Sequence, residues 1–317
     1  MTLKHLATTL AAALCLTGAG AGVAQDSAAP AQKAAAAPPP KLIVMIAVDQ
    51  FSADLFAEYR SRFTGGLARL ASGAVFPSGY QAHGATETCP GHSTILTGYH
   101  PANTGIVANH YFDLSVGRED KRIYCSEDES IPGTSSRSGQ YAPSVQKLLV
   151  PTLGDMMKDR DPRAQVVSVA GKDRSAIMMG GHRADELMWL APTGLASYRG
   201  TTLSPTAQQA SAAIAAAIAQ PRPALTLPAD CARQDIAIAL DDKVGSVGTG
   251  RLARDAGDFR RFLASPEADG AVLATAAALR QMRRMGEGDT TDLLIVGLAA
   301  TDYVGHGTGT EGAEMCL

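Results

Sequence analysis

The stretch KLIVMIAVD, residues 41–49, is a short apolar run that ends in a carboxylate. Such runs, rich in β-branched residues, are typical of strands buried on both faces of a parallel sheet. Two later stretches repeat the pattern: AQVVSVA at 164–170 and DLLIVGL at 292–298. The sequence therefore predicts three buried strands, Lys41–Val48, Ala164–Ala170 and Asp292–Leu298.

Helix-forming segments separate these strands. An amphipathic stretch runs from the first strand to Leu70, and helices are expected at Thr152–Asp159, Thr206–Ala219 and Gly270–Met285. This alternation predicts an α/β fold, a doubly wound and mostly parallel sheet with helices on both faces. Two segments rich in Gly, Pro and Ser, 112–144 and 183–258, are predicted to be loop-rich insertions that cap the sheet edge.

The overall composition excludes several classes of protein. With 317 residues, the chain holds one large domain or two of ordinary size. A net charge of −3 excludes a strongly basic nucleic-acid-binding surface and an acidic disordered tail. Hydrophobic residues make up 45% of the chain, enough to bury a core, whereas 5% aromatic residues do not favour a base- or sugar-stacking surface.

The first 24 residues have the layout of an export signal. A short polar start is followed by an almost uncharged run from Leu6 to Ala24, which ends in small residues. We interpret Met1–Ala24 as a cleaved signal peptide and Gln25–Pro40 as an Ala/Pro-rich linker. A membrane anchor is the alternative, but about 19 weakly apolar residues barely span a bilayer. The predicted location is periplasmic or secreted, with no stable membrane anchor.

Two acidic residues follow predicted strands: Asp49 comes directly after the first, and Asp302 comes soon after the third. Doubly wound sheets bind ligands beyond the carboxyl ends of their strands. Asp302 and His306 are four residues apart, which places an oxygen and an imidazole on one face of a helical turn, able to hold one metal ion. The alternatives are that each Asp caps a helix or turn and that His306 lies on the surface.

A third motif is GATETCPGHSTILTG, residues 84–98. Pro90 suits a first helical turn, so Thr88 is expected at or near a helix N-terminus, where the helix dipole favours an anion or an alkoxide. The alternative is that Thr88 is simply an N-cap. Beyond the second strand, Lys172 and Arg174 flank Asp173. These are either two cations at the ligand-binding edge of the sheet or part of an exposed charged loop.

Taken together, three stretches resemble one known family. TCPGH at 88–92, the apolar strand that ends at Asp49, and ATDYVGH at 300–306 look like the alkaline phosphatase superfamily. More narrowly, they resemble secreted bacterial alkaline phosphatases with a threonine nucleophile, which are related to the type I phosphodiesterase/nucleotide pyrophosphatases. The resemblance runs from about Lys41 to the end of the chain.

The resemblance implies two neighbouring zinc ions and a set of matching residues. Asp49 and Thr88 match positions on the zinc that activates the nucleophile, whereas Asp302 and His306 match ligands of the second zinc. Asn109 matches a residue that is hydrogen-bonded to a phosphoryl oxygen. The matching catalytic positions are thus Thr88, Asn109, Lys172 and Arg174, of which the last two would contact the transferred phosphoryl group.

The implied function is hydrolysis of small phosphate monoesters through a phospho-threonine intermediate at Thr88. A phosphodiesterase or nucleotide pyrophosphatase on the same scaffold is the first alternative. That branch typically lacks the Lys/Arg pair, so Lys172 and Arg174 favour the monoesterase. A sulfatase would need a Cys or Ser in a C-x-P-x-R setting, which Cys89 lacks because Pro90 follows it directly.

The sequence departs from the family pattern at its C-terminal end. The family has a further Asp-His pair and a late His that complete the two zinc sites. No Asp-His dipeptide occurs in this sequence, which ends eleven residues after His306. We therefore expect the chain to be the N-terminal portion of the catalytic domain, with an incomplete sheet. A non-catalytic secreted fragment is a further alternative, and the oligomeric state stays open.

Four cysteines follow the predicted signal peptide: Cys89, Cys125, Cys231 and Cys316. An even number in an exported chain favours two disulfides, and three pairings are possible. No CxxC spacing occurs, which argues against a cysteine-based zinc site. We predict the pairs Cys89–Cys125 and Cys231–Cys316, because the first would close a loop that carries Asn109 and would hold it near Thr88.

Overall fold

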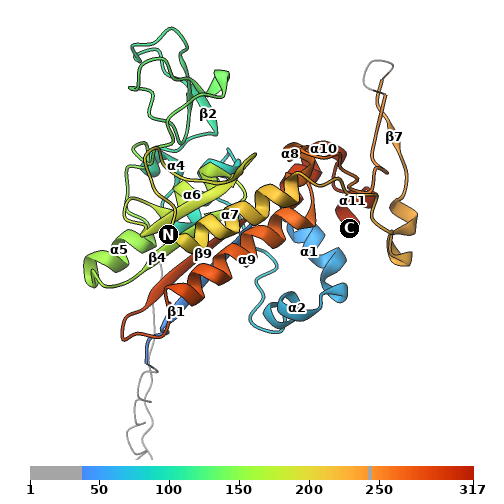
Figure 1. The fold of residues 1–317 in the computed structure, drawn as a ribbon, viewed down its shortest axis with the longest axis horizontal. Helices are drawn as coiled ribbons and strands as arrows, with labels where there is room; N and C mark the ends of the chain where they lie inside the picture. Colours follow the sequence, from blue (N-terminus) through green and yellow to red (C-terminus); the bar gives the residue numbers. More distant parts are fainter. Residues whose placement is uncertain (1–37, 242–244) are drawn as a thin grey trace, which may run out of the picture. The chain divides into compact units, whose positions relative to one another are not determined.

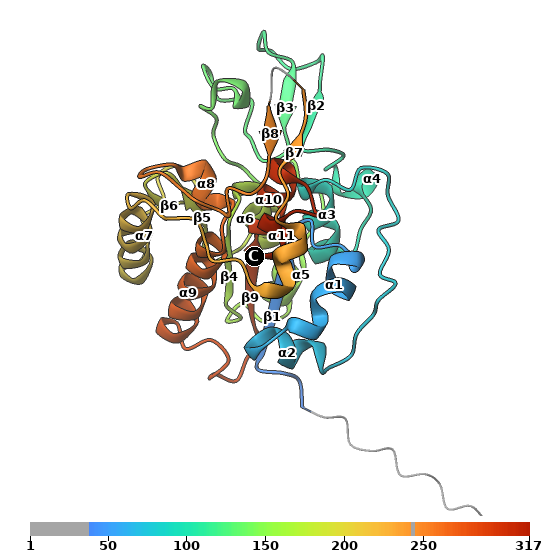
Figure 2. The ribbon, with the colours of Figure 1, turned by 90° about the vertical axis from the view of Figure 1, so that its right-hand side faces the viewer.

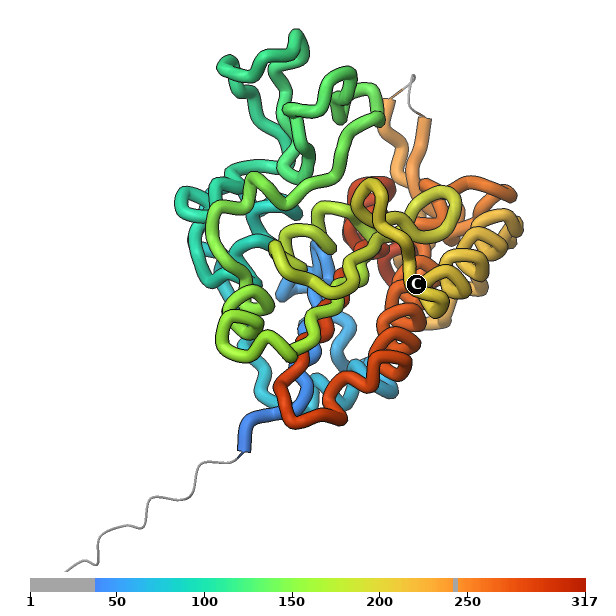
Figure 3. Tube along the Cα trace, turned by 60° about the vertical axis from the view of Figure 1, so that its left-hand side comes forward, coloured from blue at the N-terminus to red at the C-terminus, as the bar shows by residue number. Residues whose placement is uncertain are grey.

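The three apolar runs form the centre of one sheet in the computed structural model. Strand β1 (Leu42–Val48) pairs in parallel with β9 (Asp292–Leu298), which pairs in parallel with β4 (Val166–Ala170) on its other side. Figure 3 shows β9, from the red end of the chain, between blue β1 and green β4. The predicted strands are confirmed, and their carboxyl ends lie at one edge because they are parallel.

The structure describes residues 38–241 and 245–317. The predicted signal peptide, Met1–Ala24, and all of the linker up to residue 37 lie outside the described residues. Residues 39–317 form one compact unit. Within the described ranges, no helix combines the length and the apolar character that crossing a membrane requires.

Two further strands extend the sheet beyond β4. Strand β5 (Glu186–Ala191) pairs in parallel with β4, and β6 (Gly194–Ala196) pairs antiparallel with β5, giving the order β1-β9-β4-β5-β6. The prediction of a loop-rich insertion at 183–258 was therefore wrong over this part. The run ELMWLA begins with a charged residue and contains no β-branched residue, so it lacks the signal of the other strands, although Leu187 to Leu190 are buried.

Helices cover both faces of the sheet, as predicted for a doubly wound fold. Helices α7 (Pro205–Ile218) and α9 (Pro266–Met282) pack on the face that carries Val167, Val169 and Val296. The opposite face carries Val166 and Ile295 and packs against helices α3 (Thr88–Thr97), α5 (Leu153–Arg160) and α6 (Asp173–Gly180). Figure 2 shows α7 and α9 on one side of the sheet and α3 on the other.

The predicted helices are present with small shifts at their ends. Thr152 caps α5 in a capping box with Asp155, and Ser204 caps α7, which has Pro205 at its first position. Helix α9 begins at Pro266, four residues before the predicted start at Gly270, because proline is well accommodated in a first helical turn.

The remaining described elements are short and lie around this core (Figure 1). They are α1 (Ala53–Tyr59), η1 (Arg60–Arg62), α2 (Gly65–Ala71), α4 (Pro101–Thr104), β2 (His110–Phe112), β3 (Arg122–Tyr124), η2 (Ser136–Ser138), η3 (Ala229–Gln234), β7 (Ile238–Ala239), β8 (Ser246–Val247), α8 (Phe259–Leu263), α10 (Ala300–Thr308) and α11 (Ala313–Cys316). Strands β2 and β3 form an antiparallel hairpin. Both predicted disulfides, Cys89–Cys125 and Cys231–Cys316, are present.

Candidate active site

Three charged residues meet where the three central strands end. Asp49 directly follows β1, and its N–H donates to the carbonyl of Leu298 at the end of β9 (3.0 Å). Lys172 follows β4, and Asp302 lies in the first turn of α10, which begins just after β9. Because β1, β9 and β4 are adjacent and parallel, these side chains converge although 253 positions separate the first from the last.

Lys172 lies between the two carboxylates. Its Nζ donates to Asp49 Oδ2 (2.6 Å) and forms a second ion pair with Asp302 Oδ2. Lys172 is 3% exposed, and the ring of Tyr303 lies 5.0 Å from its Nζ. The alternative that this lysine belongs to an exposed loop is thereby wrong. Burial acts to raise the pKa of Asp49, but the Lys172 ammonium and its hydrogen bond outweigh burial and hold that pKa below its ordinary value.

Thr88 is the first residue of α3, as the position of Pro90 predicted. Its hydroxyl donates to Asp49 Oδ2 (3.1 Å), and the residue is 6% exposed. One turn later, Nδ1 of buried His92 bonds to the backbone carbonyl of Thr88 (2.8 Å). Burial lowers the pKa of His92, so the ring stays neutral near pH 7. Asp49 and His92 therefore both hold Thr88 at the start of α3, and the Thr88 hydroxyl lies beside the Asp49 carboxylate.

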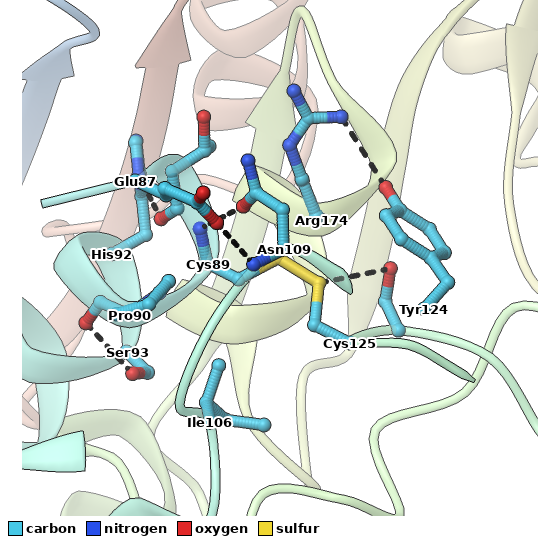
Figure 4. Close-up of a disulfide and its surroundings, with 12 residues drawn as sticks. Glu87, Cys89, Pro90, His92, Ser93, Ile106, Asn109, Tyr124, Cys125 and Arg174 are labelled. Atoms are coloured by element: carbon cyan, nitrogen blue, oxygen red, sulfur yellow. Dashed lines mark hydrogen bonds between the residues drawn. A yellow bond between two sulfur atoms is a disulfide. The ribbon is translucent and has the colours of Figure 1, made fainter. Parts of the chain in front are cut away.

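Asn109 is fixed beside the start of α3. Its side-chain Oδ1 accepts the N–H of Cys89 (2.8 Å), and its own backbone N–H donates to Glu87 Oε2 (2.5 Å). Its carbonyl accepts the N–H of Cys125 (3.0 Å), which is bonded through sulfur to Cys89. Because the amide oxygen is engaged, the NH₂ group is the part of Asn109 that remains to donate to a ligand. Figure 4 shows Asn109 and Glu87 beside the disulfide.

Arg174 lies in the first turn of α6, two residues after Lys172. Its Nη1 donates to the hydroxyl of Tyr124 (3.4 Å), which comes from β3. Burial acts to lower the pKa of Arg174, but the neighbouring Tyr124 and Asp173 oxygens outweigh it and raise that pKa above its ordinary value. Arg174 is therefore a permanent cation near the disulfide that joins α3 to the hairpin (Figure 4).

The predicted metal ligands form two pairs of donors. Asp49 and Thr88 form one, and Asp302 and His306 form the other, with Nε2 of His306 3.4 Å from Asp302 Oδ1. The carboxylate and imidazole donors suit zinc, and the Lys172 ammonium between the two carboxylates shows that this place favours positive charge. These residues fit part of a metal site. Within the described ranges, however, no three or more His, Cys, Asp or Glu side chains gather as a complete site.

Three residues of this region were missed by the sequence reasoning: Glu87, Tyr124 and Asp173. Asp173 was noted only as the residue between two cations, whereas it is 9% exposed and accepts hydrogen bonds from Tyr124 (2.8 and 2.9 Å). Glu87 precedes the helix as its N-cap. Glu87 could have been found from the sequence, because it is a charged residue directly before the Thr-Cys-Pro start of a helix. No local pattern pointed to Tyr124.

Comparison with known proteins identifies the family. A family model described as type I phosphodiesterase / nucleotide pyrophosphatase matches residues 43–316. The chain belongs to this family. Together with the relatives below, the match confirms the resemblance to the alkaline phosphatase superfamily.

Two curated relatives are alkaline phosphatases. The chain is 56% identical over 279 residues to alkaline phosphatase PhoK of Sphingomonas sp, a match that covers 87% of this chain and 49% of PhoK. It is 48% identical over 285 residues to alkaline phosphatase PhoD of Zymomonas mobilis, covering 87% of this chain and 47% of PhoD. The chain thus spans about half the length of these relatives.

The fold also matches a solved structure. The crystal structure of alkaline phosphatase PafA superposes with a TM-score of 0.67 at 27% identity, covering 89% of this chain and 57% of PafA. This match confirms the predicted α/β class with its mostly parallel central sheet.

Proposed function

We propose that the protein is an alkaline phosphatase that hydrolyses small phosphate monoesters, with Thr88 as the nucleophile. The observation that carries the proposal is the Thr88 hydroxyl at the start of α3, hydrogen-bonded to Asp49 and next to the buried Lys172. The relatives PhoK and PhoD are named alkaline phosphatases, which supports the reaction class.

A second solved PafA structure supports the choice of residues. It carries substitutions at one threonine, one asparagine, one lysine and one arginine, and it superposes with a TM-score of 0.72 at 26% identity. The threonine and asparagine there are 21 positions apart, as Thr88 and Asn109 are, and the lysine and arginine are two apart, as Lys172 and Arg174 are. These spacings favour the same four positions as the catalytic residues of this chain.

In the proposed reaction, Thr88 Oγ1 attacks phosphorus, the bond from phosphorus to the leaving oxygen breaks, and a phospho-threonine forms. The hydroxyl proton already points at Asp49 Oδ2, which is the atom placed to receive it. Water then attacks the phospho-threonine, the bond from phosphorus to Thr88 breaks, Thr88 Oγ1 takes its proton back from Asp49 Oδ2, and phosphate leaves.

The remaining groups would bind and orient the phosphoryl oxygens. The Asn109 amide and the Arg174 guanidinium are donors on the Thr88 side of the site. Lys172 adds a second positive charge, which is buried and held by the two carboxylates. Donors fixed in advance stabilise charge that develops in the transition state without further reorganisation.

Zinc is the proposed cofactor. Asp49 and Thr88 would hold one ion, and Asp302 and His306 would hold the other. When bound, two such ions lower the pKa of the attacking hydroxyl and stabilise charge on the leaving oxygen. Lys172 balances the negative charge of the Asp49 and Asp302 carboxylates.

We also propose that the protein acts in the periplasm or outside the cell. Two disulfides are consistent with an oxidising compartment, and the predicted signal peptide supplies the export route. The proposed partners are small phosphate esters only, since the net charge of −3 supplies no basic nucleic-acid surface.

A phosphodiesterase is the second candidate function, because the matching family model carries that description. A monoester presents a dianion with three non-bridging oxygens, whereas a diester presents one negative charge. The two cations, buried Lys172 and half-buried Arg174, therefore favour the monoester.

The test is to trap the covalent intermediate in the full-length protein. Enzyme mixed with a phosphate-labelled aryl monoester is quenched in acid, and the labelled peptide is mapped by mass spectrometry. We expect the phosphate on Thr88 and a higher kcat/KM for the monoester than for the matched diester. Phosphate on another residue would remove Thr88 from its role, and a faster diester reaction would favour the second candidate.

A further inference from the structure

The Arg174 guanidinium is held by one side chain. In the described part of the chain, the hydrogen bond from Nη1 to the Tyr124 hydroxyl (3.4 Å) is the one hydrogen bond of this group to the protein, while its buried Nε has no hydrogen-bond partner. We propose that Tyr124 is a positioning residue that fixes Arg174 for the phosphoryl group, and that Asp173 acts through it. This inference rests on the proposed function, because it assigns a purpose to the orientation of Arg174.

The Tyr124 hydroxyl is itself held in one orientation. It donates to both carboxylate oxygens of Asp173, at 2.8 and 2.9 Å. Tyr124 is 5% exposed and Asp173 is 9% exposed, so water does not compete for these bonds. With its proton directed at Asp173, the phenol oxygen has only its lone pairs left, and these face the guanidinium.

Asp173 cannot take this role directly. It precedes Arg174 on helix α6, and consecutive helical residues do not face each other. The carboxylate instead acts through the phenol, which becomes a stronger acceptor when its proton is bound by an anion. Burial and the Asp173 charge both raise the pKa of Tyr124, which keeps the phenol protonated and donating.

The backbone of Tyr124 is tied to the nucleophile. Tyr124 precedes Cys125, whose disulfide partner Cys89 follows Thr88 in α3. Figure 4 shows Tyr124, the last residue of β3, reaching Arg174, with Cys125 of the disulfide next to it. The chain Thr88–Cys89–Cys125–Tyr124–Arg174 therefore connects the nucleophile residue to the phosphoryl-binding cation through two peptide bonds, one disulfide and one hydrogen bond.

Tyr141 offers a matched control. Its hydroxyl also donates to Asp173, and its ring lies edge-on against Tyr124, with centroids 5.2 Å apart. In the described residues, it makes no hydrogen bond to Arg174. Tyr141→Phe removes the same atom from the same carboxylate as Tyr124→Phe does, but it leaves the contact to the guanidinium in place.

The experiment compares these variants in the full-length protein on matched aryl monoester and diester substrates. We expect Tyr124→Phe to lower kcat/KM for the monoester about tenfold, the lower end for a hydrogen bond to a charged group because the contact is long. The diester rate should fall less, and Tyr141→Phe should stay near wild type on both. Asp173→Asn, which keeps the phenol but removes the charge, should shift the monoester rate in the same direction as Tyr124→Phe.

A double-mutant comparison decides between positioning and a general structural effect. In an Arg174→Ala background, Tyr124→Phe should cost nothing further, because the group it positions is gone. Equal losses for Tyr124→Phe and Tyr141→Phe, or an unchanged loss in the Arg174→Ala background, would overturn the role of Tyr124 and leave the proposed function standing. Full monoester activity in Arg174→Ala alone would show that Arg174 does not act on the phosphoryl group. The positioning role of Tyr124 would then be overturned as well.

Discussion

The two sides of the candidate site are held very differently. On the Thr88 side, Asp49, His92, Glu87 and Asn109 bond to one another or to the start of α3, and a disulfide crosses it. On the α10 side, Asp302 pairs with Lys172, whereas the His306 side chain is 72% exposed and, among the described residues, has one ion-pair partner, Asp302 at 3.4 Å. The first side is fixed before a ligand arrives, and the second is open.

This difference fits the two tasks that the proposed reaction sets. The phosphoryl group has the same shape in every substrate, so its donors benefit from a fixed arrangement. The α10 side would meet a metal ion and a variable leaving group. The start of α10 is held by Asp269, which accepts the N–H groups of Ala299 (2.9 Å) and Ala300 (3.1 Å). Burial raises the pKa of Asp269.

The largest effect is expected at the centre of the fixed side. Thr88→Ala removes the attacking oxygen, so kcat/KM should fall on the order of a thousandfold or more, with no acid-stable phospho-enzyme. Thr88→Ser keeps a hydroxyl at the helix start and should retain appreciable activity. An Ala variant that still becomes labelled at the same rate would show that the fixed side does not hold the nucleophile.

The second effect concerns the two cations, Lys172 and Arg174. Lys172→Ala combined with Arg174→Ala should lower kcat/KM for an aryl monoester about a hundredfold, because two charge-assisted contacts are lost. The matched diester, which has one charge fewer, should lose much less. Equal losses on both substrates would mean that these cations support the fold or the carboxylates rather than the choice of ester.

The third prediction tests the open side. His306→Ala should weaken zinc binding about tenfold or more, since even partners outside the ligand shell cost that much. Competition with a chromophoric chelator measures this affinity without any turnover. His83→Ala is the control, because His83 contacts only the Gln81 side chain among the described residues. The same zinc affinity in both variants would exclude His306 as a ligand.

The fourth prediction compares the disulfides. Replacing Cys89 and Cys125 by Ala should lower kcat/KM roughly tenfold, because Asn109 and Tyr124 lose their tie to α3. Replacing Cys231 and Cys316, which join η3 to α11, should leave kcat/KM near wild type. Both variants should lose about 2–4 kcal/mol of unfolding free energy, measured by denaturant titration. If activity falls equally in both, the first disulfide serves stability alone.

The smallest effect is expected at Gly305 on the open side. A methyl group there would meet the side-chain amide of Gln50, which is exposed and can move. Gly305→Ala should therefore cost less than about 1 kcal/mol of stability and change zinc affinity only about twofold. Gly171→Ala is the contrasting variant, because its methyl would meet the Ala299 Cβ at 2.8 Å, next to the start of α10. Equal destabilisation of the two would show that the open side is more rigid than its contacts indicate.

Local chemistry was enough to predict much of this molecule from the sequence. The apolar runs that became β1, β4 and β9 carry their own length and β-branched signal, so they could be identified without their neighbours. Pro90 marked the start of α3 and placed Thr88 there, because a first helical turn accepts proline. Strand β5 was not predicted, since it begins with Glu186 and has no β-branched residue.

Only the tertiary structure decided which of these residues meet. Lys172 lies between Asp49 and Asp302 because β9, near the end of the chain, inserts between β1 and β4, and strand order depends on packing over the whole sheet. The contact between Tyr124 and Arg174 depends in the same way on a hairpin and a helix 50 residues apart. A sequence pattern shows the periodicity and the capping residues of one helix or strand. Contacts between elements depend on burial and geometry across the whole fold, which no single stretch of sequence determines.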